Sequence, residues 1–131
     1  NYKREMKNAM IISKAFINHD SISFPKYHEN KSTNNILTMS WEDGIPLTTF
    51  LESNPKQEIK NKIGQTIWDF YKIQLMELFL VHADPHPGNF LVDSEGRVGI
   101  IDFGCVKAIP DFFFERYFAL HQTRPWQPQK L

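Results

Sequence analysis

The sequence has little of several features that would place it in a common functional class. It holds a single cysteine, Cys105, which excludes an internal disulfide and fits a reducing compartment. Its 15 basic and 15 acidic residues balance, so no net positive charge supports nucleic-acid binding. The longest apolar runs, such as residues 78–81, are too short to cross a bilayer. What remains is a chain of 131 residues, enough for one modest domain with one hydrophobic core.

Apolar residues at helical spacing predict the helices of this domain. Residues 2–17 place most of their apolar side chains on one face, which is typical of an amphipathic helix. The strongest pattern covers residues 56–79, where apolar residues keep the helical period for about six turns. We expect that stripe to pack in the core. A short helix is predicted over residues 47–52, and a last one over residues 112–120 with Asp111 as its cap.

Strands are predicted on both sides of the long helix. Residues 24–28 and 35–41 are expected to form two short strands, the second with weak apolar alternation. Residues 42–46 are rich in breakers and form a connector to the next helix. Apolar residues at 90–92 and 98–101, separated by a polar turn, predict a β-hairpin. The expected fold class is therefore α+β.

The loop between the long helix and the hairpin carries the chemistry. From His82 to Asn89 it has the pattern H-x-D-x4-N, and Asp102 begins a D-F-G triplet after the hairpin. This is the arrangement of a protein-kinase catalytic loop and metal-binding loop. Asp84 would orient or deprotonate an attacking hydroxyl or water, and we predict it as the catalytic residue. Asn89 and Asp102 would supply oxygen ligands to Mg²⁺, which takes few protein ligands and keeps phosphates and waters for the rest.

Other side chains of the loop leave alternatives open. His82 is expected to be structural, anchoring the loop by hydrogen bonds, whereas His86 is a candidate for contact with substrate or nucleotide. In a rival interpretation, His82, Asp84 and His86 bind zinc or iron as H-x-D-x-H, and the metal activates a water. That interpretation leaves Asn89 and the D-F-G triplet without a role. Cys105 follows the triplet, either near a nucleotide pocket or as an inert buried thiol.

These motifs resemble those of the UbiB family, the AarF-domain atypical kinase-like proteins. The octapeptide H-A-D-P-H-P-G-N at residues 82–89 stands where ordinary protein kinases carry H-R-D-x-x-x-x-N. Leu37–Gly44 is similar to the hinge strand of the family, and Tyr2–Glu5 to the Y-x-x-E of its regulatory helix. The resemblance extends to about Leu120. It implies part of a protein-kinase-like fold: the end of the N-lobe from the regulatory helix, the hinge and the first part of the helical C-lobe.

The resemblance also implies a function and further site residues. Glu5 would pair with the ATP-binding lysine of the family, and four hinge residues would line the adenine side of the cleft: Ser40, Trp41, Glu42 and Asp43. The implied cofactors are ATP and Mg²⁺, in an ATPase or small-molecule kinase that supports ubiquinone or related isoprenoid-lipid metabolism. The alternatives are a nucleotide-gated lipid- or protein-binding chaperone-like module without phosphotransfer, and an inactive fragment.

Several family features are expected to lie outside this chain. The K-x-G-Q segment, the alanine-rich nucleotide loop and the strand lysine are absent, so we expect a piece of a longer protein that alone binds nucleotide poorly. Residues 1–41 would be the remnant of the N-lobe, 42–121 the partial C-lobe, and 122–131 a frayed or truncated tail. Implied partners are nucleotide, isoprenoid lipid and quinone-biosynthesis proteins, but not nucleic acid. The parent protein is expected in a reducing compartment, such as a bacterial cytoplasm or an organelle matrix. It would either be dissolved there or be attached peripherally to a membrane that faces this compartment.

Overall fold

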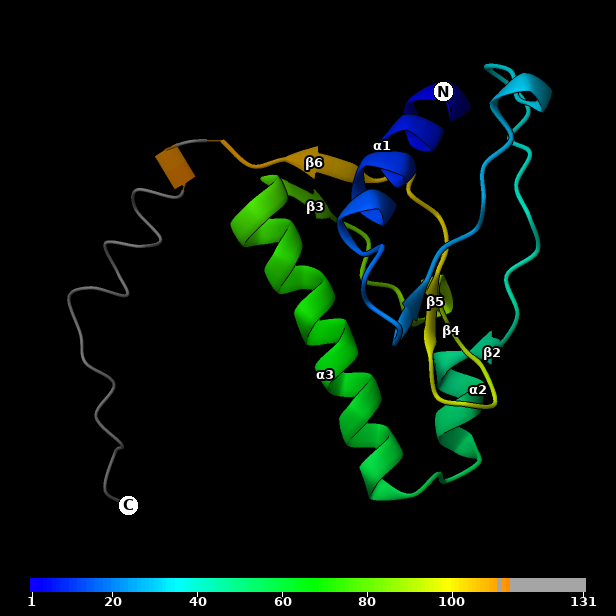
Figure 1. Ribbon diagram of the computed structural model, residues 1–131, viewed down its shortest axis with the longest axis vertical. Helices are drawn as coiled ribbons and strands as arrows, with labels where there is room; N and C mark the ends of the chain where they lie inside the picture. Colours follow the sequence, from blue (N-terminus) through cyan, green and yellow to red (C-terminus); the bar gives the residue numbers. More distant parts are fainter. Residues whose placement is uncertain (111, 114–131) are drawn as a thin grey trace.

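The computed structural model describes residues 1–110 and 112–113, arranged as helices around a small sheet (Figure 1). Helix α1 (Tyr2–Ala15) begins after Asn1, whose side-chain oxygen accepts the Lys3 N–H at 3.1 Å. This N-cap satisfies one of the free amide groups at the helix start. Met6, Ala9 and Ile12 are buried at intervals of three residues, so they form one face of the helix. The predicted N-terminal helix is confirmed, with its end two residues earlier.

The chain's long helix ends in an unusual turn. Helix α2 (Leu47–Glu52) is followed by α3 (Gln57–Ile73), and α3 continues as a π-helical turn, η2 (Gln74–Leu78). The turn stops at Phe79, which has a left-handed φ of 52°. Both helices are predicted from the sequence, but the π turn is not. Such turns are rare and often occur at functional sites.

The main sheet has the strand order β1-β5-β4-β2. Strands β4 (Phe90–Val92) and β5 (Val98–Ile100) form the predicted hairpin. Strand β1 (Ile22–Ser23) pairs parallel to β5, and β2 (Ile45–Pro46) pairs antiparallel to β4. All three residues of β5 are buried, because this strand lies inside the sheet and contacts α3. The two edge strands are not predicted, since each has only two residues and no alternation.

The strands of a second, two-stranded sheet lie just before the catalytic loop and just after the D-F-G triplet in the sequence. Strand β3 (Leu80–His82) pairs antiparallel with β6 (Val106–Ala108), and His82 lies opposite Val106. The first strand ends where the catalytic-loop motif begins, and the second begins just after the D-F-G triplet. Neither strand is predicted, because both are three residues long and their partner is distant in sequence.

The predicted strands over 24–28 and 35–41 are wrong as regular strands. The two segments do lie side by side, but they share only the single bridge Tyr27–Met39. Two further bonds, from the His28 and Ser40 amides to facing carbonyls, measure 2.9 and 2.8 Å. A short 3₁₀ turn, η1 (Glu29–Lys31), joins the segments.

Polar side chains explain why these segments do not form regular strands. The Ser32 hydroxyl contacts the backbone of both His28 and Thr38, and in this way replaces ladder bonds with side-chain bonds. Pro25 interrupts the first segment because it has no N–H to donate. At the other end of the chain, residues 112–113 are helical, while the rest of the predicted last helix, its Asp111 cap and the tail at 122–131 lie outside the described residues.

The hydrophobic core joins α1, α3 and the hairpin. Phe70 of α3 is fully buried, and its ring centroid lies 5.4 Å from that of Phe16 and 6.5 Å from that of Phe90. The core continues to Phe103 of the D-F-G triplet, which is fully buried and lies 5.9 Å from Phe24. Packing of the core therefore fixes the position of the motif loops. Among the described residues, no helix is long and apolar enough to cross a membrane.

Candidate nucleotide and metal site

The catalytic-loop motif forms a compact turn between β3 and β4. The Ala83 N–H donates to the Cys105 carbonyl at 2.7 Å, which extends the pairing of β3 with β6 by one bond. The loop then closes through a 3₁₀ turn, η3 (Pro87–Asn89), where the Asn89 N–H donates to the His86 carbonyl at 2.9 Å. Proline at the first position of this turn has the φ that the turn requires.

Asp84 and Asn89 contact each other directly. The side-chain amide of Asn89 donates to both the carbonyl and the Oδ2 atom of Asp84, each at 3.2 Å. Both side chains are half-buried. Because the NH₂ group of Asn89 faces Asp84, its Oδ1 atom is left to act as a ligand. The catalytic and metal-binding candidates of the loop thus hold each other in place.

A backbone hydrogen bond links the segment of Asp102 to Asn89. The Ile101 N–H, one residue before it, donates to the Asn89 carbonyl at 3.0 Å. Asp102 itself has a left-handed φ of 61°, and its Oδ1 atom accepts the Gly104 N–H at 3.0 Å. A non-glycine residue in this region costs free energy, and such residues cluster at functional sites. The side chain of Asp102 is exposed and available to a ligand.

His82 is buried and contacts two residues of the D-F-G triplet. It is only 1% exposed, and its Nε2 atom lies 2.7 Å from the Asp102 carbonyl oxygen. A carbonyl can only accept, so the proton of this contact is on Nε2. The ring also packs edge-on against Phe103, with centroids 5.3 Å apart. This arrangement agrees with the structural role expected for His82.

The rival His-Asp-His metal site does not assemble. The Nε2 atom of His82 is engaged with Asp102, and the residue is buried. His86 is exposed, and its Nδ1 atom accepts the Gly88 N–H at 3.1 Å. Within the described part of the chain, no group of three His, Cys, Asp or Glu side chains could hold a metal ion by itself.

The donor atoms of the motif do fit a Mg²⁺ shared with a nucleotide. The Asp102 carboxylate and the Asn89 amide oxygen are the hard oxygen ligands that this ion prefers. Mg²⁺ sites usually combine one or two carboxylates with substrate phosphates and waters, so two protein ligands suffice.

Glu5 of α1 also lies beside the D-F-G triplet. A Cβ atom placed on Gly104 would lie 3.1 Å from Asp102 Oδ1 and 3.5 Å from Glu5 Oε2, so both carboxylates border this glycine. Burial raises the pKa of Glu5, and the negative charge of Asp102 raises it further. Helix α1 therefore brings the Glu5 carboxylate beside Asp102, which favours a cation between or near the two.

A cleft of about 620 Å³ opens beside these residues. Ser40, Trp41 and Glu42 line it, whereas Asp43 is not among its lining residues. Leu91 and Ile101 also line the cleft, and the sequence alone does not single them out. Their place in the motifs is a usable signal, because they lie two residues after Asn89 and one before Asp102.

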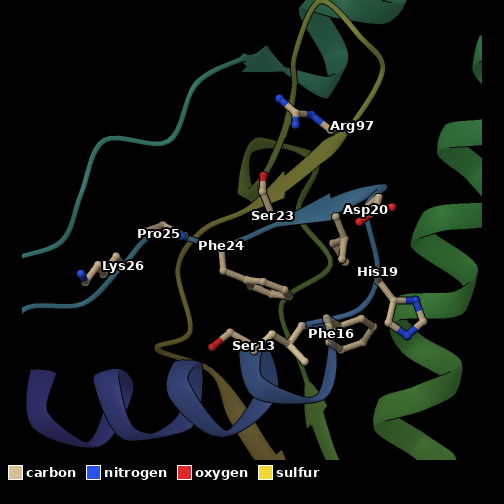
Figure 2. A pocket seen from close by; sticks show the side chains of 11 residues that line it. Ser13, Phe16, His19, Asp20, Ser23, Phe24, Pro25, Lys26 and Arg97 are labelled. Atoms are coloured by element: carbon tan, nitrogen blue, oxygen red, sulfur yellow. The ribbon is translucent and has the colours of Figure 1, made fainter.

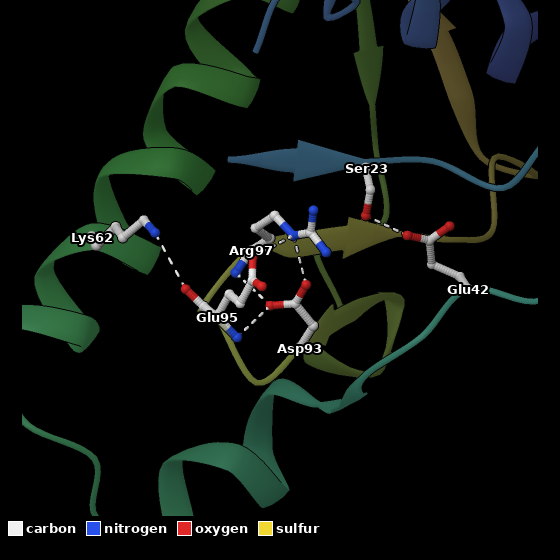
Figure 3. Close-up of polar contacts among 6 residues, drawn as sticks. All are labelled: Ser23, Glu42, Lys62, Asp93, Glu95 and Arg97. Atoms are coloured by element: carbon white, nitrogen blue, oxygen red, sulfur yellow. Dashed lines mark hydrogen bonds and ion pairs between the residues drawn. The ribbon is translucent and has the colours of Figure 1, made fainter. Parts of the chain in front are cut away.

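Two of the hinge side chains are held by their neighbours. The Ser40 hydroxyl accepts the Lys26 N–H at 2.8 Å. The Glu42 carboxylate accepts the hydroxyl of Ser23 in β1 (Figure 3). Glu42 lies across Gly99, where an added Cβ would come within 2.8 Å of Glu42 Cγ, so a larger residue there would force the Glu42 side chain to move. Trp41, by contrast, is 87% exposed.

Two tyrosine hydroxyls are buried near the site without a hydrogen-bond partner among the described residues: those of Tyr27 and Tyr71. Burial raises the pKa of Tyr27, and the charges of Glu5 and Asp102 raise it further. Burial and then the charge of Asp84 raise the pKa of Tyr71. Both phenols are therefore neutral donors near the acidic side chains of the site.

A second cavity, of about 560 Å³, lies apart from the motif residues. It is found where α1 ends and β1 begins, and Ser13, His19, Lys26 and Arg97 contribute to its lining (Figure 2). None of the residues predicted for catalysis, metal binding or nucleotide binding lines it.

Comparison with known proteins gives the family of the chain. Residues 1–123 match the family model described as the ABC1 atypical kinase-like domain. The chain belongs to this family. The resemblance drawn from the octapeptide and the D-F-G triplet is thereby confirmed.

Curated relatives of this ABC1 domain are much longer than the chain. It is 29% identical over 127 residues to "Protein ACTIVITY OF BC1 COMPLEX KINASE 3, chloroplastic" of Arabidopsis thaliana, covering 92% of the chain and 16% of the relative. It is 34% identical over 116 residues to an ABC1 family protein of Schizosaccharomyces pombe, covering 85% of the chain and 21% of the relative. The chain therefore spans about a sixth to a fifth of the length of these relatives.

The fold of the ABC1 domain also has a solved counterpart. The structure of the Rv3197–erythromycin complex from Mycobacterium tuberculosis matches the whole chain with a TM-score of 0.70 and 22% identity, and the match covers 37% of that chain. The predicted α+β, protein-kinase-like fold is confirmed.

Proposed function

We propose that the full-length protein binds Mg-ATP and either hydrolyses it or transfers its terminal phosphoryl group to a small molecule. The observation that carries the proposal is the set of hydrogen bonds that joins the catalytic loop to the segment of the D-F-G triplet. Asn89 contacts Asp84 through its side chain and Ile101 through its carbonyl, so the loop and the D-F-G triplet converge beside the hinge cleft.

In this proposal each residue has a distinct task. Asp84 receives or orients the proton of the attacking hydroxyl or water, and the amide of Asn89 fixes the direction of its carboxylate. Asn89 and Asp102 would hold Mg²⁺, whose chemistry is to neutralise charge on the phosphates during transfer. The cleft residues Ser40, Trp41, Glu42, Leu91 and Ile101 would bind the adenine, and Asp43 and His86 would be further contacts of the nucleotide.

The first prediction is that each of two conservative substitutions strongly reduces turnover. Asp84→Asn removes the proton acceptor, and Asp102→Asn removes a charged metal ligand. Each should lower Mg-ATP turnover of the full-length protein by about 100-fold or more. Asp69→Asn is the matched control, because Asp69 lies on α3 outside the candidate site and, among the described residues, accepts a hydrogen bond from Gln65 Nε2 at 3.0 Å. Turnover that is unchanged in both site variants would refute the proposal.

We further propose that the acceptor or regulator is an isoprenoid lipid or a quinone-biosynthesis protein. The support is the resemblance of the octapeptide and hinge to the UbiB family. A phosphorylated lipid or metabolite, detected by mass spectrometry, would establish phosphoryl transfer. Turnover that lipid stimulates without any phosphorylated product would instead favour the nucleotide-gated binding module.

The proposed location is a reducing compartment, in solution or peripherally on a membrane. Cys105 is exposed and free, which suits such a compartment. The Arabidopsis relative is described as chloroplastic, which supports an organelle interior as one possibility among those predicted.

A further inference from the structure

Gln74 has a buried side chain whose two polar ends are both bonded to groups of the core. It is the first residue of the π turn and has no exposed surface. Its Nε2 atom donates to the Phe70 carbonyl at 3.0 Å, and its Oε1 atom accepts the His82 N–H at 2.7 Å. A buried amide is costly unless both its donor and its acceptor are used, so these bonds define its place in the core.

The bonds of Gln74 continue directly to the D-F-G triplet. The His82 N–H is held by Gln74, and the ring of the same residue contacts the Asp102 carbonyl at 2.7 Å. Three hydrogen bonds in series thus join the carbonyl of Phe70 in α3 to the backbone of Asp102. His82 has little freedom to move, since it is 1% exposed and packs against Phe103.

The position of Asp102 depends on this series because its backbone is strained. With a φ of 61°, the residue keeps its left-handed conformation only while its surroundings hold it. The His82 ring donates to the carbonyl of Asp102 itself. Gln74 holds the backbone of His82 in place, because its Oε1 atom accepts the His82 N–H. An apolar side chain at position 74 would fill the same space but leave the buried His82 N–H without its acceptor.

We propose that Gln74 is a positioning residue, which holds His82 and through it the Asp102 carboxylate in the geometry required for Mg²⁺. The proposal rests on the proposed function, because it concerns the metal-binding role of Asp102. Gln74 touches neither nucleotide nor metal in this arrangement and acts only through His82.

The test compares Gln74→Met with Gln65→Met in the full-length protein. Methionine preserves volume and helix propensity but cannot make the two hydrogen bonds. Gln65 of the preceding helix α3 is the matched control, since it is exposed and, within the described part of the chain, its amide donates to Asp69 at 3.0 Å. We expect Gln74→Met to raise the Mg²⁺ concentration for half-maximal turnover about ten-fold, which is typical for supporting residues of metal sites. Gln65→Met should leave that concentration unchanged.

Amide hydrogen exchange gives a readout that does not depend on turnover. In Gln74→Met, the amides of residues 102–105 should exchange faster than in the wild type, because the Gly104 N–H is bonded to Asp102 Oδ1. In Gln65→Met they should not. Faster exchange confined to α3 and β3, with an unchanged Mg²⁺ requirement, would show a merely structural role and overturn the proposal.

Gln74→Glu supplies a conservative rescue. When protonated, its carboxyl group can both donate to Phe70 and accept from His82, as the amide does. Once it ionises, it faces the Phe70 carbonyl without a proton to donate. The Mg²⁺ requirement of this variant should therefore be close to that of the wild type at low pH and rise as the pH passes the elevated pKa of the buried acid. A pH-independent requirement equal to that of the wild type would overturn the proposal.

The outcomes separate the two proposals. If the wild type neither binds nor turns over Mg-ATP, the proposed function fails, while hydrogen exchange at residues 102–105 still decides whether Gln74 controls Asp102. If the wild type is active and both readouts of Gln74→Met match those of Gln65→Met, only the positioning role fails.

Discussion

Two carboxylates approach each other across a glycine at the centre of the site. Asp102 and Glu5 both border Gly104, and the amide of this glycine is already bonded to Asp102 Oδ1. The pKa of Glu5 is raised first by its partial burial and then by repulsion from the negative charge of Asp102. At this scale, the site has excess negative charge that a cation would relieve, which is the electrostatic basis of the proposed Mg-ATP binding.

The second prediction concerns the space that Gly104 leaves open. In Gly104→Ala the new methyl group would lie 3.1 Å from Asp102 Oδ1, tighter than an ordinary contact, so the carboxylate must shift. We expect turnover of the full-length protein to fall about ten-fold, as for other changes that displace a metal ligand. The free energy of unfolding should change by less than about 1 kcal/mol, since alanine also restricts the unfolded chain.

Gly64→Ala is the control for this substitution. Gly64 lies within α3, and a Cβ atom there meets nothing within 4 Å. Alanine should stabilise the helix by roughly 0.5–1 kcal/mol and leave turnover unchanged. Thermal melting and turnover of the two variants measure both effects. Equal turnover in the wild type and Gly104→Ala would contradict the prediction.

The β4–β5 hairpin supports the site from the turn at its far end. Asp93 Oδ1 accepts the N–H groups of Glu95 and Arg97, each at 2.9 Å, and Oδ2 pairs with Arg97 Nε at 2.7 Å (Figure 3). Lys62 of α3 reaches the Glu95 carbonyl at 3.3 Å, which joins the turn to the long helix. The turn therefore fixes the register of the strands that lead to Asn89 and Asp102.

The third prediction tests this turn. Burial alone raises the pKa of Asp93, but the amide and guanidinium of Arg97 and the Glu95 amide outweigh it and lower the pKa below 3.8. A lowered pKa means that the ionised form stabilises the fold, fully so above the ordinary value and less as the pH falls. Because Asp93→Ala removes the three hydrogen bonds of this turn, we expect it to destabilise the chain by about 1 kcal/mol at neutral pH.

The stability gap between wild type and Asp93→Ala should narrow as the pH falls below 3.8, where the wild-type carboxylate becomes protonated. Urea denaturation at several pH values measures the free energy of unfolding of both proteins. Ser94→Ala is the control in the same turn, because Ser94 is exposed and makes none of the three bonds. A gap that widens toward acid would contradict the sign of the prediction.

The sequence predicts elements whose signals are local. The long helix, the short helix at 47–52, the hairpin and the loop motifs each depend on contiguous residues, and the structure forms them all. Strands β1 and β3, by contrast, owe their existence to partners far along the chain, so two or three residues carry no pattern of their own. The π turn has no local signal either, and its first residue, Gln74, bonds to His82 on β3 rather than within the helix alone.

The candidate site is predictable to a similar extent. The spacing of Asp84, Asn89 and Asp102 is enough by itself to indicate a shared site. Glu5 enters only through resemblance to a family, because no periodicity reveals that α1 packs against the D-F-G triplet. Leu91 and Ile101 escape notice because an apolar strand residue is normally assigned to the core, and only the position of the cleft distinguishes them.

At the scale of the whole molecule, the chain contains one side of a proposed nucleotide site. Ile101, which precedes the D-F-G triplet, lines the cleft beside the hinge residues, and Gly104 of the triplet lines a second pocket together with Glu5 of α1. The match covers 16% of the Arabidopsis relative, so most of that protein lies outside the matched segment.

The fourth prediction compares the chain with the full-length protein. At a Mg-ATP concentration about 100 times the dissociation constant, ligand binding should stabilise the full-length protein by about 2.7 kcal/mol. A polypeptide of these 131 residues should show little or no shift in its melting temperature under the same conditions. Asp102→Asn should abolish the shift in the full-length protein. A comparable shift in the short chain would show that its own residues suffice to grip the phosphates.

The pairing of β3 with β6 has a consequence for the way in which the fold forms. These strands bring residues 80–82 and 106–108 together, and the bond from Ala83 to Cys105 closes the segment between them into a loop. Closing a loop costs entropy that grows only slowly with its length. When β3 pairs with β6, the catalytic loop, the hairpin and the D-F-G triplet are all enclosed in this one loop. The residues proposed to act together on a nucleotide would then also fold, and open, as a single cooperative unit.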